Sequence, residues 1–104
     1  MAQLKKSAGK LQATGTDRII RLSWSHLEGG CLIRAVLLSL SGEELGLNSG
    51  GVAPVKIESP KPCTSELLIG AWTTLKCRIA DKSSELFLSL SEAFDDMEEK
   101  LQYL

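Results

Sequence analysis

The feature that most constrains this chain is an alternating run followed by an almost continuous apolar run, with two glycines between them. In residues 18–25 every second side chain is apolar, at Ile20, Leu22 and Trp24. This is the period of a strand with one buried face. Residues 31–41 are apolar nearly throughout, and Gly29-Gly30 can supply the tight connection of a hairpin. A buried helix is the alternative for residues 31–41, but the flanking glycines favour a strand, so the sequence predicts a hairpin.

Three further segments are typical of extended chain. Residues 52–58 alternate around Pro54, which cannot donate to a ladder, and they predict an edge strand. Residues 66–80 form a long β-prone stretch in which Gly70 indicates a bulge or bend. Residues 85–90 could then pair back on the end of that stretch as a second hairpin.

The C-terminal stretch predicts a helix over residues 91–103. Its apolar side chains recur at steps of three and four residues: Leu90, Phe94, Met97, Leu101 and Leu104. Such spacing places them along one face of a helix. Acidic side chains crowd the first turns, where the helix dipole favours negative charge, and Ser89 with Glu92 has the form of a capping box.

These elements predict an α+β fold, a mostly antiparallel sheet of about five strands packed by one C-terminal helix. Residues 17–104 are interpreted as a single domain with this fold. Residues 1–16 carry several lysines and show no regular apolar period, so they are predicted to be a flexible basic N-terminal arm.

The composition of the 104-residue chain is that of a globular domain, with 43% hydrophobic and 24% charged residues. The net charge is −1, and no apolar run reaches the roughly 18–20 residues of a membrane span, so no membrane association is expected. Three cysteines form no even framework, which favours a reducing intracellular setting, cytoplasmic or nuclear. Cys31 and Cys77 lie in apolar runs and are predicted to be buried, whereas Cys63 is predicted to be the most exposed.

Catalysis is not expected of this sequence. His26 is the only imidazole, and strand geometry directs the nearby Ser23 and Ser25 to one face while the loop that follows turns away. One histidine and three separated cysteines cannot complete a structural zinc site, and no phosphate-binding glycine motif is present. We therefore predict no enzyme activity, no metal and no cofactor.

The favoured function is a non-catalytic intracellular protein-interaction or adaptor module, a homodimer or one subunit of a larger complex. One short helix cannot bury both faces of strands that are apolar on both sides. We therefore expect another chain to bury part of the apolar surface of the sheet. The alternative is that the apolar face of the C-terminal helix only covers the sheet of the same chain. The predicted partner-binding residues are Phe94, Met97, Leu101, Tyr103 and Leu104.

The second function class is single-stranded nucleic-acid binding. Basic residues gather in the first third of the chain, and strands followed by a helix are similar in layout to small single-strand-binding modules. The predicted contacts are Lys5, Lys6, Lys10, Arg18, Arg21 and Arg34. Lys76 and Arg78 would add positions on another strand, and Trp24 or Trp72 could stack on bases. Against stacking, Trp24 shares its face with apolar residues, which favours a place in the core.

Overall fold

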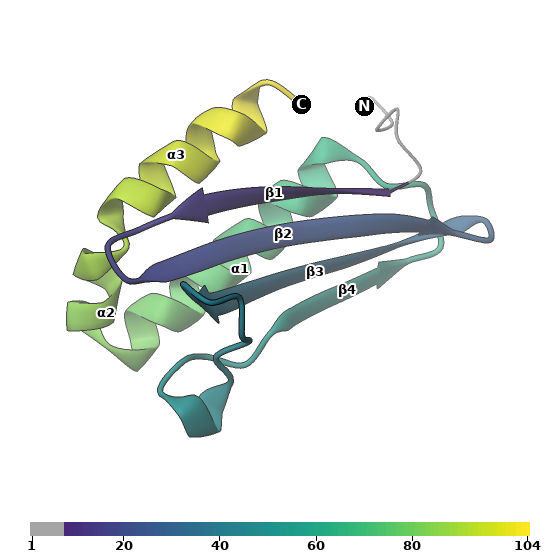
Figure 1. Cartoon of the computed structure of the whole chain (residues 1–104). Helices are drawn as coiled ribbons and strands as arrows, with labels where there is room; N and C mark the ends of the chain where they lie inside the picture. The colour runs from purple at the N-terminus through teal and green to yellow at the C-terminus, as the bar shows by residue number, and fades with distance from the viewer. Residues whose placement is uncertain (1–7) are drawn as a thin grey trace.

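The structure, a computed structural model that describes residues 8–104, is a four-stranded sheet with α-helices against one of its faces (Figure 1). The strands come first and the helices follow, which confirms an α+β fold with an antiparallel sheet and helices at the C-terminus. The elements in chain order are β1 (Ala8–Thr14), β2 (Arg18–Leu27), β3 (Gly30–Ser39), the 3₁₀ turn η1 (Leu47–Ser49), β4 (Val55–Ser59), α1 (Ser65–Lys82), α2 (Ser84–Ser89) and α3 (Ser91–Gln102). Over the described residues the sheet therefore has four strands rather than about five, and three helices follow it rather than one.

Each strand pairs antiparallel with the next, so the sheet order is β1-β2-β3-β4. The predicted hairpin is confirmed, because β2 and β3 pair along their whole length with Trp24 opposite Ile33. Gly29 turns the hairpin at a φ of 70°, a conformation that glycine adopts at little cost. The predicted edge strand is β4, which lies at one edge of the sheet directly after Pro54.

Part of the predicted flexible arm is a strand. Residues 8–14 form β1 and pair with β2 from Ala8 opposite Ser25 to Thr14 opposite Ile19. The inward positions of β1 include Gly9 and Ala13, whose small side chains give almost no apolar alternation in the sequence. The segment is held by its ladder with β2 rather than by a strong pattern of its own.

Residues 66–80, predicted to be extended, form most of α1. The side chains that α1 buries are spaced as on a helix: Leu68, Ala71, Trp72, Leu75 and Ile79. The Thr64 hydroxyl caps the helix by accepting the Leu67 N–H at 3.3 Å, and Glu66 lies in the first turn, where the dipole favours an acid. The β-branched pair Thr73-Thr74 has strand propensity, but burial of a helical apolar face outweighs it.

The predicted strand over residues 85–90 is instead the short helix α2, capped by the Ser83 hydroxyl, which accepts the Leu86 N–H at 3.2 Å. The predicted C-terminal helix is confirmed as α3, but it begins without a capping box. Leu90 occupies the N-cap position, and the Ser89 hydroxyl donates to the Leu86 carbonyl at 2.7 Å.

The core is the layer between the helices and one face of the sheet (Figure 1). Helix α1 contacts β2, β3 and β4, while α3 lies against β1. The side chains of Ile20, Leu22 and Trp24 from β2 are all buried in this layer. None of the helices in residues 8–104 is long and apolar enough to cross a membrane.

Cys31 is buried as predicted, but the other two cysteines differ from their predicted environments. Cys31 and Cys63 form a disulfide that joins β3 to the residue before the N-cap of α1, with their Cα atoms 4.9 Å apart. Cys63, predicted to be the most exposed, is buried, whereas Cys77, predicted to be buried, is an exposed free thiol on α1. Because disulfides persist mainly in oxidising compartments, the cysteines no longer favour an intracellular location.

Candidate functional site

Two surfaces of the described chain have features of a binding site. The first is a groove of about 420 Å³ between α1 and α3, which we call the α1–α3 groove. It is lined by Ile69, Trp72, Thr73, Lys76, Glu98, Leu101 and Gln102. Ile69 lies near the start of α1 and Gln102 at the end of α3, whereas Lys76, further along α1, pairs with Glu98, earlier on α3. The two helices therefore run in opposite directions along the groove.

The floor of the α1–α3 groove is apolar and firmly packed. Trp72 and Leu101 are buried beneath it, and the Trp72 ring packs edge-on against Phe94 with centroids 5.4 Å apart. An ion pair lies at the rim, where Lys76 Nζ donates to Glu98 Oε2 at 2.7 Å. The same ammonium group lies 5.3 Å from the centroid of the Phe94 ring, within the range of a cation–π contact.

Large apolar side chains are exposed in the wall of the groove and just after the end of α3. Ile69, in the groove wall, is 43% exposed. Tyr103 and Leu104, which directly follow the last turn of α3, are 80% and 44% exposed. An exposed apolar side chain in the wall of an apolar groove is a feature of a surface that another molecule can cover.

The structure separates the predicted partner-binding residues into two groups. Phe94 and Met97 are buried in the chain's own core, and Leu101 is nearly so in the groove floor, because the stripe of α3 packs on β1 and its neighbours. These three are therefore core residues in the folded chain rather than surface anchors. Tyr103 and Leu104 lie at the surface. Ile69 was missed because its segment was interpreted as a strand, although its place on α1 follows from the helical spacing of the buried residues.

The second surface is the face of the sheet opposite the helices. Strand register aligns Lys10, Ser23, Arg34 and Lys56 in one row across all four strands, and Gln12 and Arg21 pair in the next row. We call the four cations of these rows, Lys10, Arg21, Arg34 and Lys56, the basic sheet face. All four are exposed or half-buried.

Intramolecular contacts hold three of these cations in place. Arg34 donates to both oxygens of Glu44, at 3.1 and 3.2 Å. Hydrogen bonding from Arg34 holds the pKa of the Glu44 carboxyl below its ordinary value, and the same bond raises the pKa of Arg34. Arg21 Nε donates to Gln12 Oε1 at 2.6 Å, and Lys56 Nζ lies 3.1 Å from Glu58 Oε1.

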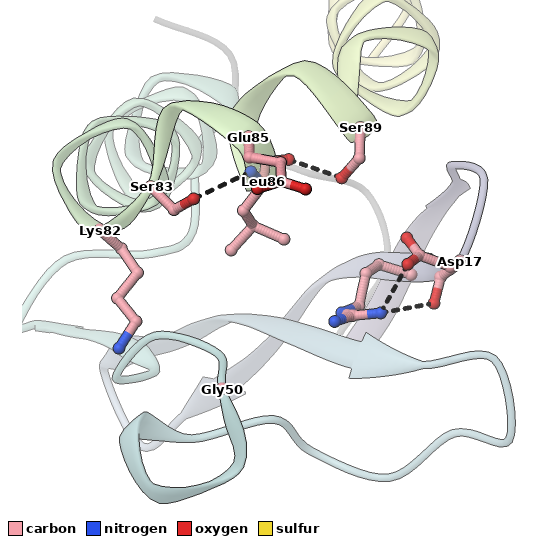
Figure 2. Close-up of a pocket in the computed structure, with 8 residues that line it drawn as sticks. Asp17, Gly50, Lys82, Ser83, Glu85, Leu86 and Ser89 are labelled. Carbon is pink, nitrogen blue, oxygen red and sulfur yellow. Dashed lines mark hydrogen bonds and ion pairs between the residues drawn. The ribbon is translucent and has the colours of Figure 1, made fainter.

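Arg18, predicted with this group, lies elsewhere. It lines a hollow of about 240 Å³ between the β1–β2 turn, the loop at Gly50 and the junction of α1 with α2. Its guanidinium pairs with the Asp17 carboxylate at 2.9 Å, and its Nε is buried without a hydrogen-bond partner in the described part of the chain. Figure 2 shows Lys82 and Glu85 in the same hollow, which therefore balances two bases against two acids.

The other predicted nucleic-acid contacts are also placed differently. Lys5 and Lys6 lie outside the described residues. Lys76 and Arg78 are on α1, where Lys76 pairs with Glu98 and Arg78 donates to the Ala53 and Pro54 carbonyls, so neither joins the sheet face. Trp24 and Trp72 are both buried in the core and do not form a stacking platform.

His26 has a structural contact. Its Nδ1 accepts the backbone N–H of Cys63 at 3.4 Å, which ties the end of β2 to the segment before α1. Alternation along β2 places Ser23 and Ser25 on the face away from the helices and His26 on the other side of the strand. No group of three or more His, Cys, Asp or Glu side chains in residues 8–104 could hold a metal ion.

No protein-family model, curated protein or solved structure matches this chain. Its function therefore has to be argued from the two surfaces described above.

Proposed function

We propose that this chain is a non-catalytic protein-interaction module that assembles with a second copy of itself through the α1–α3 groove. The observation that carries the proposal is an apolar groove with the exposed side chain of Ile69 in its wall, followed along the chain from Gln102, its last lining residue, by the exposed Tyr103 and Leu104. Full burial of one such side chain contributes roughly 1.5–3 kcal/mol. The intracellular location, cytoplasmic or nuclear, stays an untested prediction, and the Cys31–Cys63 disulfide removes the cysteine count as support for it.

The shape of this surface favours a second copy as the occupant. A symmetric dimer buries the same patch on both subunits, so that patch must supply both the projecting groups and the recess that receives them. Here Ile69 projects from the wall of a recess whose floor is formed by Trp72 and Leu101. The surface can therefore be complementary to itself.

Charge favours the same occupant. The rim carries one base and one acid, Lys76 and Glu98, already joined in an ion pair, so two copies of the groove approach without net repulsion. The rest of α3 is strongly acidic, and the opposite face of the molecule is basic. Either of those surfaces would repel its own copy across a twofold axis.

The role of His26 supports a non-catalytic module. Its Nδ1 is occupied by the Cys63 amide, and the neighbouring serines lie on the other face of β2, so the arrangement lacks a base directed at a nucleophile. This leaves binding as the chemistry that the described surfaces support best.

Sedimentation equilibrium from micromolar to near-millimolar protein tests the proposal. We expect a monomer–dimer equilibrium for the wild-type chain. Ile69→Glu should weaken the dimer by at least about 100-fold, because a carboxylate would be buried in an apolar recess. Tyr103→Ala should weaken it by about tenfold through lost contact area.

Leu88→Glu is the matched control, because Leu88 is 71% exposed on α2 and does not line the groove. It makes the same kind of change at an apolar surface position and should leave the dimer intact. Circular dichroism would show that all variants are folded. A wild-type chain that stays monomeric throughout, or an Ile69→Glu variant that associates as well as Leu88→Glu, contradicts the proposal.

A further inference from the structure

We infer that the basic sheet face binds the phosphate backbone of single-stranded nucleic acid. This inference does not depend on the proposed dimer, because the sheet face and the α1–α3 groove lie on opposite sides of the sheet (Figure 1). It rests on the register of the strands, which brings together cations that are far apart in the sequence.

The register gives the surface its shape. Lys10, Arg34 and Lys56 come from three different strands and align in one row, and Arg21 lies in the adjacent row. Neighbouring strands lie about 4.8 Å apart, so the row spans about 14 Å. Ser23 lies between Lys10 and Arg34 in the first row, and Gln12 lies beside Arg21 in the second. Both side chains can donate hydrogen bonds to phosphate oxygens.

The charge of the molecule is divided between its two sides. The basic sheet face has four cations and two acidic neighbours, Glu44 and Glu58. On the helix side, α3 alone carries five acids and one base. A polyanion is therefore attracted to the sheet face and repelled by the helix side, which fixes the side on which it binds.

The two rows of cations hold no exposed apolar side chain, which favours phosphate over an acidic protein segment. Protein interfaces depend on apolar or aromatic anchors at their centre, whereas contacts to a phosphate backbone do not. Val36 shares the row of Arg21 but is buried, as is Leu38 in the row beyond it. The remaining large apolar side chains of β2 and β3 on this face, Ile19, Leu27 and Leu32, lie in rows outside those of the cations.

The absence of aromatic side chains from this face, among the residues that the structure describes, sets the mode of binding. Without stacking, contact is limited to phosphates and sugars, so binding should be independent of base sequence. A flexible single strand of nucleic acid can follow both rows of cations. A rigid duplex can bring only a few of its phosphates close to the same cations. Four cations predict a salt dependence with a slope of about −3 in log K against log [salt].

The test is fluorescence anisotropy of a labelled oligothymidylate, titrated with the full chain at low and at physiological salt. We expect binding that weakens steeply with salt, and a duplex of equal length that binds more weakly. Arg21→Glu and Lys56→Glu should each lower the affinity by about tenfold or more, because each replaces a phosphate contact with repulsion.

Lys82→Glu is the matched control, since it makes the same change in net charge at the end of α1. It should bind the oligonucleotide nearly as the wild-type chain does. Equal loss in Lys82→Glu would show that only net charge matters and would overturn the inference. Poly-glutamate that competes as well as the oligonucleotide at equal charge would overturn it in favour of an acidic protein partner.

Discussion

At the scale of single residues, two glycines with opposite roles show how local contacts determine stability. Gly9 lies opposite Trp24 in the β1–β2 ladder, and a side chain at this position would meet the indole ring directly. Gly70 lies on the exposed side of α1, where an added Cβ would meet nothing within 4 Å. Gly9 is thus required by close packing, whereas Gly70 only weakens the helix that contains it.

We therefore predict opposite effects for the same substitution. Gly9→Ala should destabilise the chain by about 1–3 kcal/mol, because the tryptophan ring must shift in a packed core. Gly70→Ala should stabilise it by about 1 kcal/mol, because alanine loses less backbone entropy in a helix. Urea unfolding of both variants measures the two changes. A loss of stability in Gly70→Ala would show that the exposed face of α1 is constrained in some other way.

At the scale of elements, a strand or helix with a clear apolar period of its own was predictable from the sequence. A strand whose burial depends on pairing with a neighbouring strand was not. The strand β2 follows from a period of two, β3 from an apolar run after two glycines, and α3 from a period of three to four residues. The strand β1 carries almost no such period, because Gly9 and Ala13 occupy inward positions whose burial depends on β2. The error at α1 has another cause: Gly70 and the pair Thr73-Thr74 obscured a helical spacing that is present in the same residues.

The disulfide links two of these elements and gives a prediction at this scale. Cys31 and Cys63 are 32 residues apart, and joining them restricts the unfolded chain. The chain-entropy relation assigns such a loop about 3–4 kcal/mol. Replacing both cysteines with alanine should lower the free energy of unfolding by about that amount, measured by urea unfolding without reductant.

Cys77→Ala is the control for this prediction, because Cys77 is an exposed free thiol on α1. It should change stability by less than about 0.5 kcal/mol, as is usual for surface substitutions. If the double variant were as stable as Cys77→Ala, the disulfide would not constrain the chain in solution.

At the scale of the whole molecule, the candidate surfaces were predicted only in part. Arg21 and Arg34 were expected on adjacent strands and do share one face, but Lys56 could join them only once the register of β4 was known. Arg18 is separated from them because its side chain lines a hollow next to α1 and α2. Tyr103 and Leu104 were expected at a partner surface and are exposed, whereas the α1–α3 groove could be predicted only if residues 66–80 were recognised as a helix.

The arrangement of the two surfaces on opposite sides of the sheet leads to a prediction about the assembled protein. A dimer formed through the α1–α3 groove leaves both basic sheet faces open to solvent. A long oligonucleotide can then bind two faces at once, and the second contact is strengthened by its high effective concentration. A short oligonucleotide can occupy only one face.

Ile69→Glu separates these two contributions, because Ile69 lines the groove and is remote from the sheet face. For each protein, the affinity for a long oligothymidylate is divided by the affinity for a short one. At protein concentrations where the wild-type chain is dimeric, this ratio should be at least about tenfold larger for the wild-type chain than for Ile69→Glu. Both proteins should bind the short oligonucleotide equally, as measured by anisotropy at low salt. An equal ratio in both proteins would show that the dimer does not join two nucleic-acid sites. Weaker binding of the short strand by Ile69→Glu would instead place that residue within the nucleic-acid surface.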